Sequence, residues 1–242
     1  YEIRLSLVGS EMCIRDSHAS PPCYSYILSA MTWIIKRSWL IYLVHGKYNM
    51  QRSTPGKENY MNSFSCVITG HRPTRFKFKY NEKDKRCQRI KKCLQEQLIR
   101  LYHQGVRCFW VGGAMGVDMW AAELLLRMKE QQAYQDVELC LALPFEGYNA
   151  DWDDWHRKRM DFIRRYAEKV LVLGEMPSSE SYKKRNYYMV EQAGHMIAVY
   201  DNAHNMRSGT QQTVNYAKKK GLQIIYIHPD TAQVTAEDIT KK

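Results

Sequence analysis

The chain has 242 residues, of which 45% are hydrophobic and 25% charged, a balance typical of a soluble globular protein. This length fits one ordinary domain with additional sequence. The formal net charge of +11 is concentrated in residues 61–110, which hold 12 Lys and Arg against three Asp and Glu. That excess favours an anionic partner such as a nucleotide or nucleic acid, although a solvated helix face explains it equally well.

The chain has seven cysteines, and no two of them show C-x-x-C spacing, which argues against a zinc site. An odd number of cysteines without a disulfide framework fits a reducing cytoplasm, so we predict a cytoplasmic protein. Three cysteines stand in apolar runs, and we expect them to be buried core thiols: Cys66, Cys108 and Cys140. We expect neither a metal site nor a cofactor.

The first sixty residues look unlike the rest of the chain. Residues 7–17, LVGSEMCIRDS, match a translation of the transposon adapter used in sequencing libraries, so we interpret residues 1–17 as an assembly artefact. Residues 26–44 are apolar, but Lys36 and Arg37 in their middle would each cost about 2.5–3.5 kcal/mol in a membrane, so we predict no span. We interpret residues 18–60 as translated upstream sequence, disordered or non-native, and Met61 as the native start, with Met50 as the alternative.

From Met61 onward, apolar runs alternate with segments of helical periodicity. We predict one domain over residues 61–230, followed by residues 231–242 as a polar tail or a small added element. Predicted strands cover residues 66–69, 108–111, 137–143, 169–173, 196–200 and 223–227. Predicted helices cover residues 85–103, 117–129, 153–166, 184–192 and 210–219.

This alternation predicts an α/β fold that is Rossmann-like, with a mostly parallel sheet of about six strands and helices on both faces. The strands are nearly continuous apolar runs, as expected of a sheet covered on both sides. Ligands in such sheets bind at the carboxyl ends of the strands, near the point where the strand order reverses.

A glycine loop, GGAMGVD, follows the second predicted strand and opens a helix. Glycines let the backbone approach a ligand, and helix N-terminal N–H groups attract anions, so the loop favours a phosphate-bearing ligand. A tight turn without a ligand is the alternative. No Gly-Lys-Ser/Thr follows, which argues against ATP hydrolysis of the P-loop type. The candidate binding residues are Gly112, Gly113, Ala114, Gly116 and Asp118.

A second candidate loop follows the first strand and contains Thr69, Gly70, His71 and Arg72. Arg72 could pair with a phosphate or a carboxylate through two hydrogen bonds. Basic and aromatic residues then alternate over residues 75–80, a pattern that suits base stacking in single-stranded nucleic acid. We slightly favour an edge strand there, with one face packed and lysines on the other.

The remaining candidates also stand at predicted strand ends or helix starts. Hydroxyls at 208 and 210 could cap a helix, bind a phosphate or do both. Asp118 and Glu123 are the carboxylates that could act as an acid or base. The sequence has neither a G-x-S-x-G elbow nor a metal cluster. The other candidate ligand-binding residues are Phe145, Arg185, Asn186, Ser208, Gly209 and Thr210.

Taken in order, TGHRP at 69–73, GGAMGVD at 112–118, LPFE at 143–146, RN at 185–186 and SGT at 208–210 resemble the YpsA-like branch of the SLOG superfamily. The resemblance covers residues 64–229, and the superfamily includes DprA proteins and the LOG phosphoribohydrolases. It implies a Rossmann-like fold that binds nucleotides or nucleotide-derived ligands, in a bacterial or prophage protein. The LOG enzymes carry a catalytic glutamate where this chain has Thr213, and this departure argues against the same reaction.

Three functions follow, in order of preference. The first is binding or sensing of a nucleotide-like small molecule, and the second is hydrolysis of an N-glycosidic bond in a nucleotide. The third is binding of single-stranded nucleic acid through residues 72–92. The sequence leaves a homo-oligomer open and indicates no membrane partner.

Overall fold

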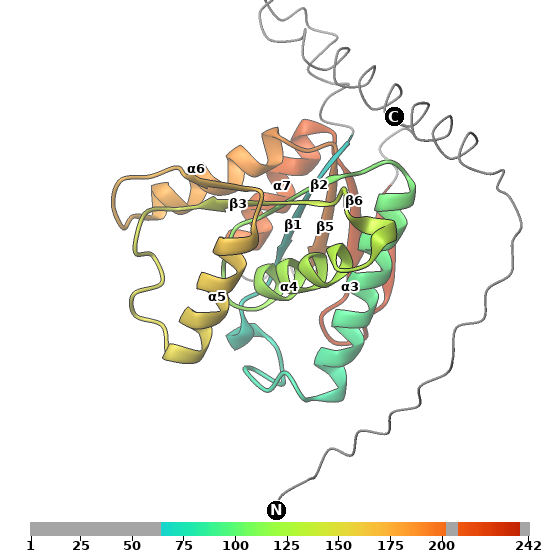
Figure 1. Cartoon of the computed structure of the whole chain (residues 1–242), viewed down its shortest axis with the longest axis horizontal. Coiled ribbons are helices and arrows are strands. Elements are labelled where there is room, and N and C mark those ends of the chain that lie inside the picture. Colours follow the sequence, from blue (N-terminus) through green and yellow to red (C-terminus); the bar gives the residue numbers. More distant parts are fainter. Residues whose placement is uncertain (1–63, 202–207, 238–242) are drawn as a thin grey trace, which may run out of the picture. The chain divides into compact units, whose positions relative to one another are not determined.

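A seven-stranded sheet in the order β4-β3-β2-β1-β5-β6-β7 is the centre of the protein, which we describe from a computed structural model (Figure 1). The structure describes residues 64–201 and 208–237, so the predictions for residues 1–60 lie outside it. Strands β1 to β6 are parallel to their neighbours, and β7 runs antiparallel to β6. The strands are β1 (Ser65–Gly70), β2 (Cys108–Val111), β3 (Glu138–Leu143), β4 (Lys169–Val172), β5 (His195–Val199), β6 (Gln223–Ile227) and β7 (Val234–Glu237).

Helices cover both faces of the sheet, as the sequence predicts (Figure 1). One face packs against α3 (Lys85–His103), α4 (Val117–Lys129) and α5 (Asp154–Tyr166). The other packs against α6 (Ser179–Glu191) and α7 (Gly209–Lys220). Two short 3₁₀ turns, η1 (Pro73–Arg75) and η2 (Gln132–Tyr134), stand in the connections. Successive strand residues enter opposite cores, so both faces of the sheet are buried.

The strand order reverses between β1 and β5. The chain builds outward from β1 through β2 and β3 to β4, then crosses to the other side of β1 and continues with β5 and β6. The last residues of the two central strands, Gly70 and Val199, are register partners. The loops that follow β1 and β5 therefore begin side by side, which is where sheets of this kind bind their ligands.

Most predicted elements lie within a residue or two of their observed bounds, and three segments differ. Helix α6 begins at Ser179, five residues earlier than predicted, because the Ser178 hydroxyl caps it by accepting the Ser181 N–H at 3.0 Å. Strand β7 lies in the segment predicted as a tail or small added element. The edge strand over residues 75–80 is wrong, because the chain turns at η1 and stacks Phe76 on Phe78, with ring centroids 4.9 Å apart.

Candidate functional site

A cavity of about 330 Å³ opens at the carboxyl end of β1. It brings together five separate stretches of the chain: the loop after β1, the glycine loop after β2, the start of α4, helix α6 and the start of α7. The lining includes Thr69, Gly70, His71, Arg72, Ala114, Asp118, Arg185, Asn186, Ser208, Gly209 and Thr210, all of them candidates from the sequence.

The first turn of α7 forms one wall of this cavity. Ser208 caps the helix, since its Oγ accepts the Gln211 N–H at 3.1 Å. Thr210 Oγ1 donates to the Gly70 carbonyl at 2.9 Å and so fixes the helix start against the end of β1. At Gly209 an added Cβ would meet no atom within 4 Å, so this backbone faces open space. A helix N-terminus with an open approach attracts anions.

Asp118 and Arg185 form a buried ion pair at the base of the cavity. Asp118 Oδ2 accepts the backbone N–H groups of Gly112 at 3.1 Å and Ala114 at 3.3 Å, and it lies 3.5 Å from Arg185 Nη1. Burial raises the pKa of Asp118 against the opposing effect of Arg185, and burial lowers the pKa of Arg185. Arg185 is 5% exposed, and its Nε has no hydrogen-bond partner among the described residues.

The glycines of the loop after β2 make room for the protein's own side chains. A Cβ at Gly112 would lie 1.3 Å from Arg185 Nη1, and a Cβ at Gly113 would lie 2.7 Å from Tyr148 Oη. Tyr148 also donates to the Gly113 carbonyl at 2.9 Å. Gly116 has a φ of +93° and lies against Pro73. These three glycines do not line the cavity; the loop instead presents Ala114 and Asp118 to it.

His71 is buried at 3% exposure, and its Nε2 lies 3.2 Å from Asp201 Oδ1. The edge of its ring also contacts Tyr200, with centroids 5.4 Å apart. Burial lowers the pKa of His71, although the hydrogen bond and charge of Asp201 oppose that effect. The side chain therefore favours the neutral form and ties the ends of β1 and β5 together.

Arg72 is exposed, and its guanidinium lies over the ring of Tyr182, 5.8 Å from the centroid. Together with Arg75 and Arg185 it gives the lining three guanidinium groups, against the single carboxylate of Asp118. An excess of positive charge around an open helix N-terminus suits a phosphate or another anion.

Besides the three glycines Gly112, Gly113 and Gly116, two further candidates lie outside this cavity. Phe145 is 6% exposed and contacts the edge of the Tyr182 ring, so it supports the lining without reaching the open space. Glu123 stands on α4 beside a separate groove, where it accepts from Arg159 at 2.7 Å. Arg159 also donates to Glu82 at 2.8 Å. Burial opposes ionisation of Glu82, but hydrogen bonds from Arg159 and Lys91 hold its pKa at about 2.

Several side chains of the basic stretch at 72–92 are buried or form ion pairs within the fold. Phe76 and Phe78 are buried, so of the aromatic residues at 75–80 only Tyr80 is exposed, at 54%. Lys77 pairs with Asp230 at 2.9 Å, and Lys91 pairs with Glu82 at 2.6 Å. The aromatic groups available for base stacking are therefore fewer than the sequence pattern suggests.

Four lining residues are absent from the small-molecule candidates named from the sequence: Thr74, Arg75, Tyr182 and Met189. Thr74 and Arg75 do lie in the stretch 72–92 that the sequence offers as a candidate nucleic-acid surface. Helical spacing in the sequence could have identified one of the four, Tyr182. Tyr182 precedes Arg185 by three residues, and residues three apart lie on the same side of a helix. That inference requires α6 to begin before residue 184, as it does in the structure.

Among residues 64–201 and 208–237, no helix combines the length and the apolar content needed to cross a membrane. The free cysteines of these ranges are Cys66, Cys87, Cys93, Cys108 and Cys140. Cys66 and Cys140 are buried, as predicted, while Cys108 is only half-buried.

Comparison with known proteins places this architecture in a family. The chain is 31% identical over 158 residues to a UPF0398 protein of Bacillus cereus, covering 64% of this chain and 83% of that protein. A UPF0398 protein of Bacillus thuringiensis is 29% identical, with the same coverage.

Two solved structures are also similar. DNA processing protein A (DprA) from Streptococcus pneumoniae has a TM-score of 0.46 and 16% identity over 76% of this chain, which spans about half (54%) of that structure. DprA from Helicobacter pylori, whose structure concerns single-stranded DNA binding, has a TM-score of 0.45 and 18% identity, over 70% of this chain and 67% of that one. A family model described as the YspA SLOG family matches residues 66–232. The chain therefore belongs to the YspA SLOG family.

Proposed function

We propose that the cavity binds a nucleotide or a nucleotide-derived small molecule, and that the protein is a binding or sensing module for it. One observation carries this proposal: three arginines and the open first turn of α7 converge on a cavity whose lining has one carboxylate. Arginine side chains and helix N-termini are the groups that proteins use to bind phosphate.

In this proposal the phosphate of the ligand lies between Arg72 and the backbone of Gly209, where the helix dipole adds to the guanidinium charge. The Tyr182 ring offers a face or edge to a base. The buried Arg185 Nε, which has no partner among the described residues, supplies a further donor at the base of the cavity. An unpaired buried donor costs about 1–3 kcal/mol, so a ligand that satisfies it gains affinity.

A thermal-shift screen of nucleotides and nucleotide sugars tests this proposal, with inorganic phosphate and unphosphorylated nucleosides as matched controls. We expect at least one phosphorylated compound to raise the melting temperature, since a ligand that binds only the folded state stabilises it. The corresponding nucleoside should have a smaller effect. If no nucleotide or nucleotide sugar moves the melting temperature, the proposal fails.

Cleavage of an N-glycosidic bond in a nucleotide is the second candidate, because Asp118 lines the cavity. Burial raises the pKa of Asp118, and a raised carboxyl pKa suits a general acid or base, which works best when its pKa is near the operating pH. Against it, Thr213 stands at the position of the catalytic glutamate of the LOG enzymes and has no carboxylate. Its side chain is fully buried, and its hydroxyl donates to the Gly209 carbonyl at 2.8 Å. Incubation with nucleoside monophosphates, followed by chromatography for the free base, decides between binding and cleavage. Unchanged substrate across the panel would remove this candidate.

Binding of single-stranded nucleic acid is the third candidate. It rests on exposed cations within residues 72–92, namely Arg72, Lys79, Lys83, Lys85, Arg89 and Lys92, together with the exposed Tyr80. Affinity should fall steeply with salt if several phosphates are contacted. A gel-shift experiment without retardation at low salt would eliminate it.

A further inference from the structure

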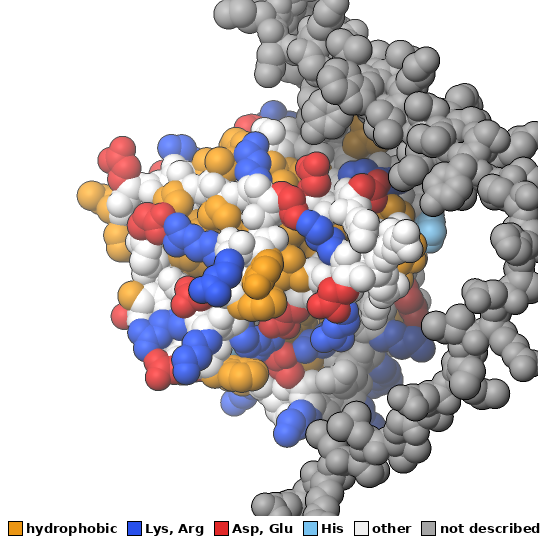
Figure 2. Space-filling model, in the orientation of Figure 1, with side chains coloured by type: hydrophobic (Ala, Val, Ile, Leu, Met, Phe, Trp, Pro, Cys, Tyr) orange, Lys and Arg blue, Asp and Glu red, His pale blue; other side chains and the backbone are white. Residues whose placement is uncertain are grey.

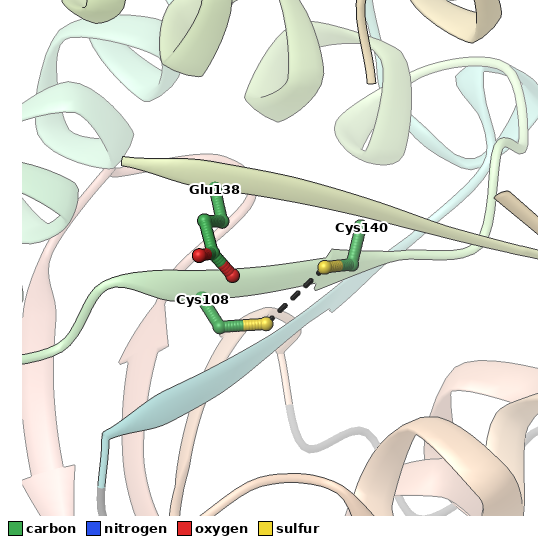
Figure 3. A group of neighbouring side chains, drawn as sticks. All are labelled: Cys108, Glu138 and Cys140. Carbon is green, nitrogen blue, oxygen red and sulfur yellow. Dashed lines mark hydrogen bonds between the residues drawn. The ribbon is translucent and has the colours of Figure 1, made fainter. Parts of the chain in front are cut away.

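Two thiols and a carboxylate converge at the amino ends of β2 and β3, on the opposite edge of the sheet from the cavity (Figure 3). Cys108 is the first residue of β2, and Glu138 and Cys140 are the first and third residues of β3. The two Sγ atoms lie 3.2 Å apart. One ligand atom from each residue lies within 4.8 Å of the other two.

The strand register brings these three side chains to one face of the sheet. Cys108 is the register partner of Glu138. Because side chains alternate along a strand, Cys140 points to the same side as Glu138, two residues earlier. Figure 3 shows the Glu138 carboxylate directed toward the two sulfur atoms. Ligands that converge through sheet register leave no C-x-x-C spacing, which explains why the sequence predicts no metal site.

We propose that Cys108, Cys140 and Glu138 form a site for a thiophilic divalent cation of the Zn²⁺ type, with water as the fourth ligand. Zinc binds Cys and carboxylate ligands at about 2.3 Å and 2.0–2.2 Å in a tetrahedral arrangement. Two sulfurs on one zinc ion are then about 3.7 Å apart. The thiols would separate by about half an ångström from their present 3.2 Å, a change that a small rotation of the half-buried Cys108 supplies.

The site is built to admit a cation from solvent. Glu138 is exposed and Cys108 is half-buried, while Cys140 is 2% exposed and held in the core. Binding converts both thiols to thiolates, and their two protons go to bulk water. The cation then links β2 to β3 and stabilises the folded state. Because the cavity lies at the other edge of the sheet, this proposal does not depend on ligand binding there.

The test is a Co²⁺ titration of the reduced, metal-free chain of 242 residues. Co²⁺ replaces Zn²⁺ at such sites, and thiolate ligands give it a charge-transfer absorption band. We expect the band to appear, to be displaced by Zn²⁺, and to be unaffected by Mg²⁺. Zn²⁺ should also raise the melting temperature by several degrees. The band should vanish in Cys108→Ala and Cys140→Ala. Glu138→Gln should weaken Zn²⁺ binding by at least the roughly tenfold that loss of an outer-shell partner of a metal ligand costs.

Two controls separate this site from the other thiols. Cys93→Ala removes a half-buried thiol of α3 outside the cluster, and Cys13→Ser/Cys23→Ser removes the thiols that lie outside the described residues. Both proteins should keep the band. The proposal is overturned if the wild-type protein gives no thiolate band, if the band survives in folded Cys108→Ala, or if it disappears in Cys13→Ser/Cys23→Ser. Glu138 is exposed, so Glu138→Gln remains informative even if the cysteine variants do not fold.

Discussion

The guanidinium of Arg185 occupies the space that a side chain at Gly112 would need, since an added Cβ would lie 1.3 Å from Nη1. The glycine loop and α6 are thereby fitted to each other at the base of the cavity. Asp118 joins the same arrangement, because its Oδ2 accepts the Gly112 N–H and lies 3.5 Å from Arg185. The loop therefore positions a buried cation beside the candidate ligand site.

Gly112→Ala should displace Arg185 and destabilise the protein by about 1–3 kcal/mol, as overpacking does in a well-packed site. Urea unfolding measures the loss. Gly209→Ala is the matched control, since its Cβ would meet no atom within 4 Å. Its free energy of unfolding should stay within about 0.5 kcal/mol of wild type or rise slightly. Equal stability of the two variants would contradict the packing role of Gly112.

Asp118→Ala should lower the free energy of unfolding by about 3–5 kcal/mol, because it leaves the Arg185 guanidinium buried without its anion. Adding Arg185→Met to Asp118→Ala should restore part of that loss. A double-mutant cycle by urea denaturation measures the coupling between the two residues. Strictly additive effects would show that the ion pair does not carry the stability assigned to it.

Stability should fall as the pH drops through about 6.5, in part because of His71. Burial lowers the pKa of His71 in the folded protein below its ordinary value of 6.5. At pH values between the lowered pKa of the folded protein and 6.5, the unfolded chain binds a proton at His71 that the folded protein does not. The contribution of His71 to stability is therefore present above pH 6.5 and is lost as the pH falls from 6.5 through the folded pKa. His71→Gln should show a shallower decline between pH 7 and pH 5.

Chemical denaturation at several pH values measures this difference. Burial also lowers the pKa of His195, so His195→Gln is the matched control and should remove a separate part of the slope. If His71→Gln and the wild type lose stability in parallel over this interval, the folded pKa of His71 is not depressed.

Glu123→Gln should act on stability and leave ligand binding unchanged, because Glu123 pairs with Arg159 and does not line the cavity. Loss of a hydrogen bond between charged groups predicts a destabilisation of about 1–2 kcal/mol. Thermal melts with and without the ligand found in the screen show both the change in stability and the response of the variant to the ligand. A ligand response abolished in folded Glu123→Gln would instead place this carboxylate in the binding machinery.

The sequence predicts α3, α4, β2 and β6 with their observed bounds, because caps, glycines and periodic apolar residues near each end are local signals. It also predicts which loops meet, since parallel strands place their carboxyl ends at one edge of the sheet. The glycine loop shows the limit of such reasoning. Its sequence suits a ligand, but the space beside Gly112 and Gly113 belongs to Arg185 and Tyr148.

Other features depend on contacts between segments that are far apart in the sequence. The sequence pattern places Phe76 and Phe78 on one face of an edge strand, but in the structure they follow a 3₁₀ turn, stack on each other and contact the Trp120 ring. Arg185 stands in a helix rich in polar residues, and its burial becomes evident only when α6 packs across the glycine loop. The cluster of Cys108, Glu138 and Cys140 likewise requires the register between β2 and β3.

Calorimetric titration of Gly209→Asp with the phosphorylated ligand from the screen tests the nucleotide site most directly. An aspartate in the first turn of α7 favours the helix through its dipole, so the fold is preserved while negative charge enters the cavity. Gly209→Asn, of nearly the same shape but uncharged, is the matched control. We predict that Gly209→Asp lowers affinity at least tenfold more than Gly209→Asn does. Equal affinities of the two variants would contradict phosphate binding at the start of α7.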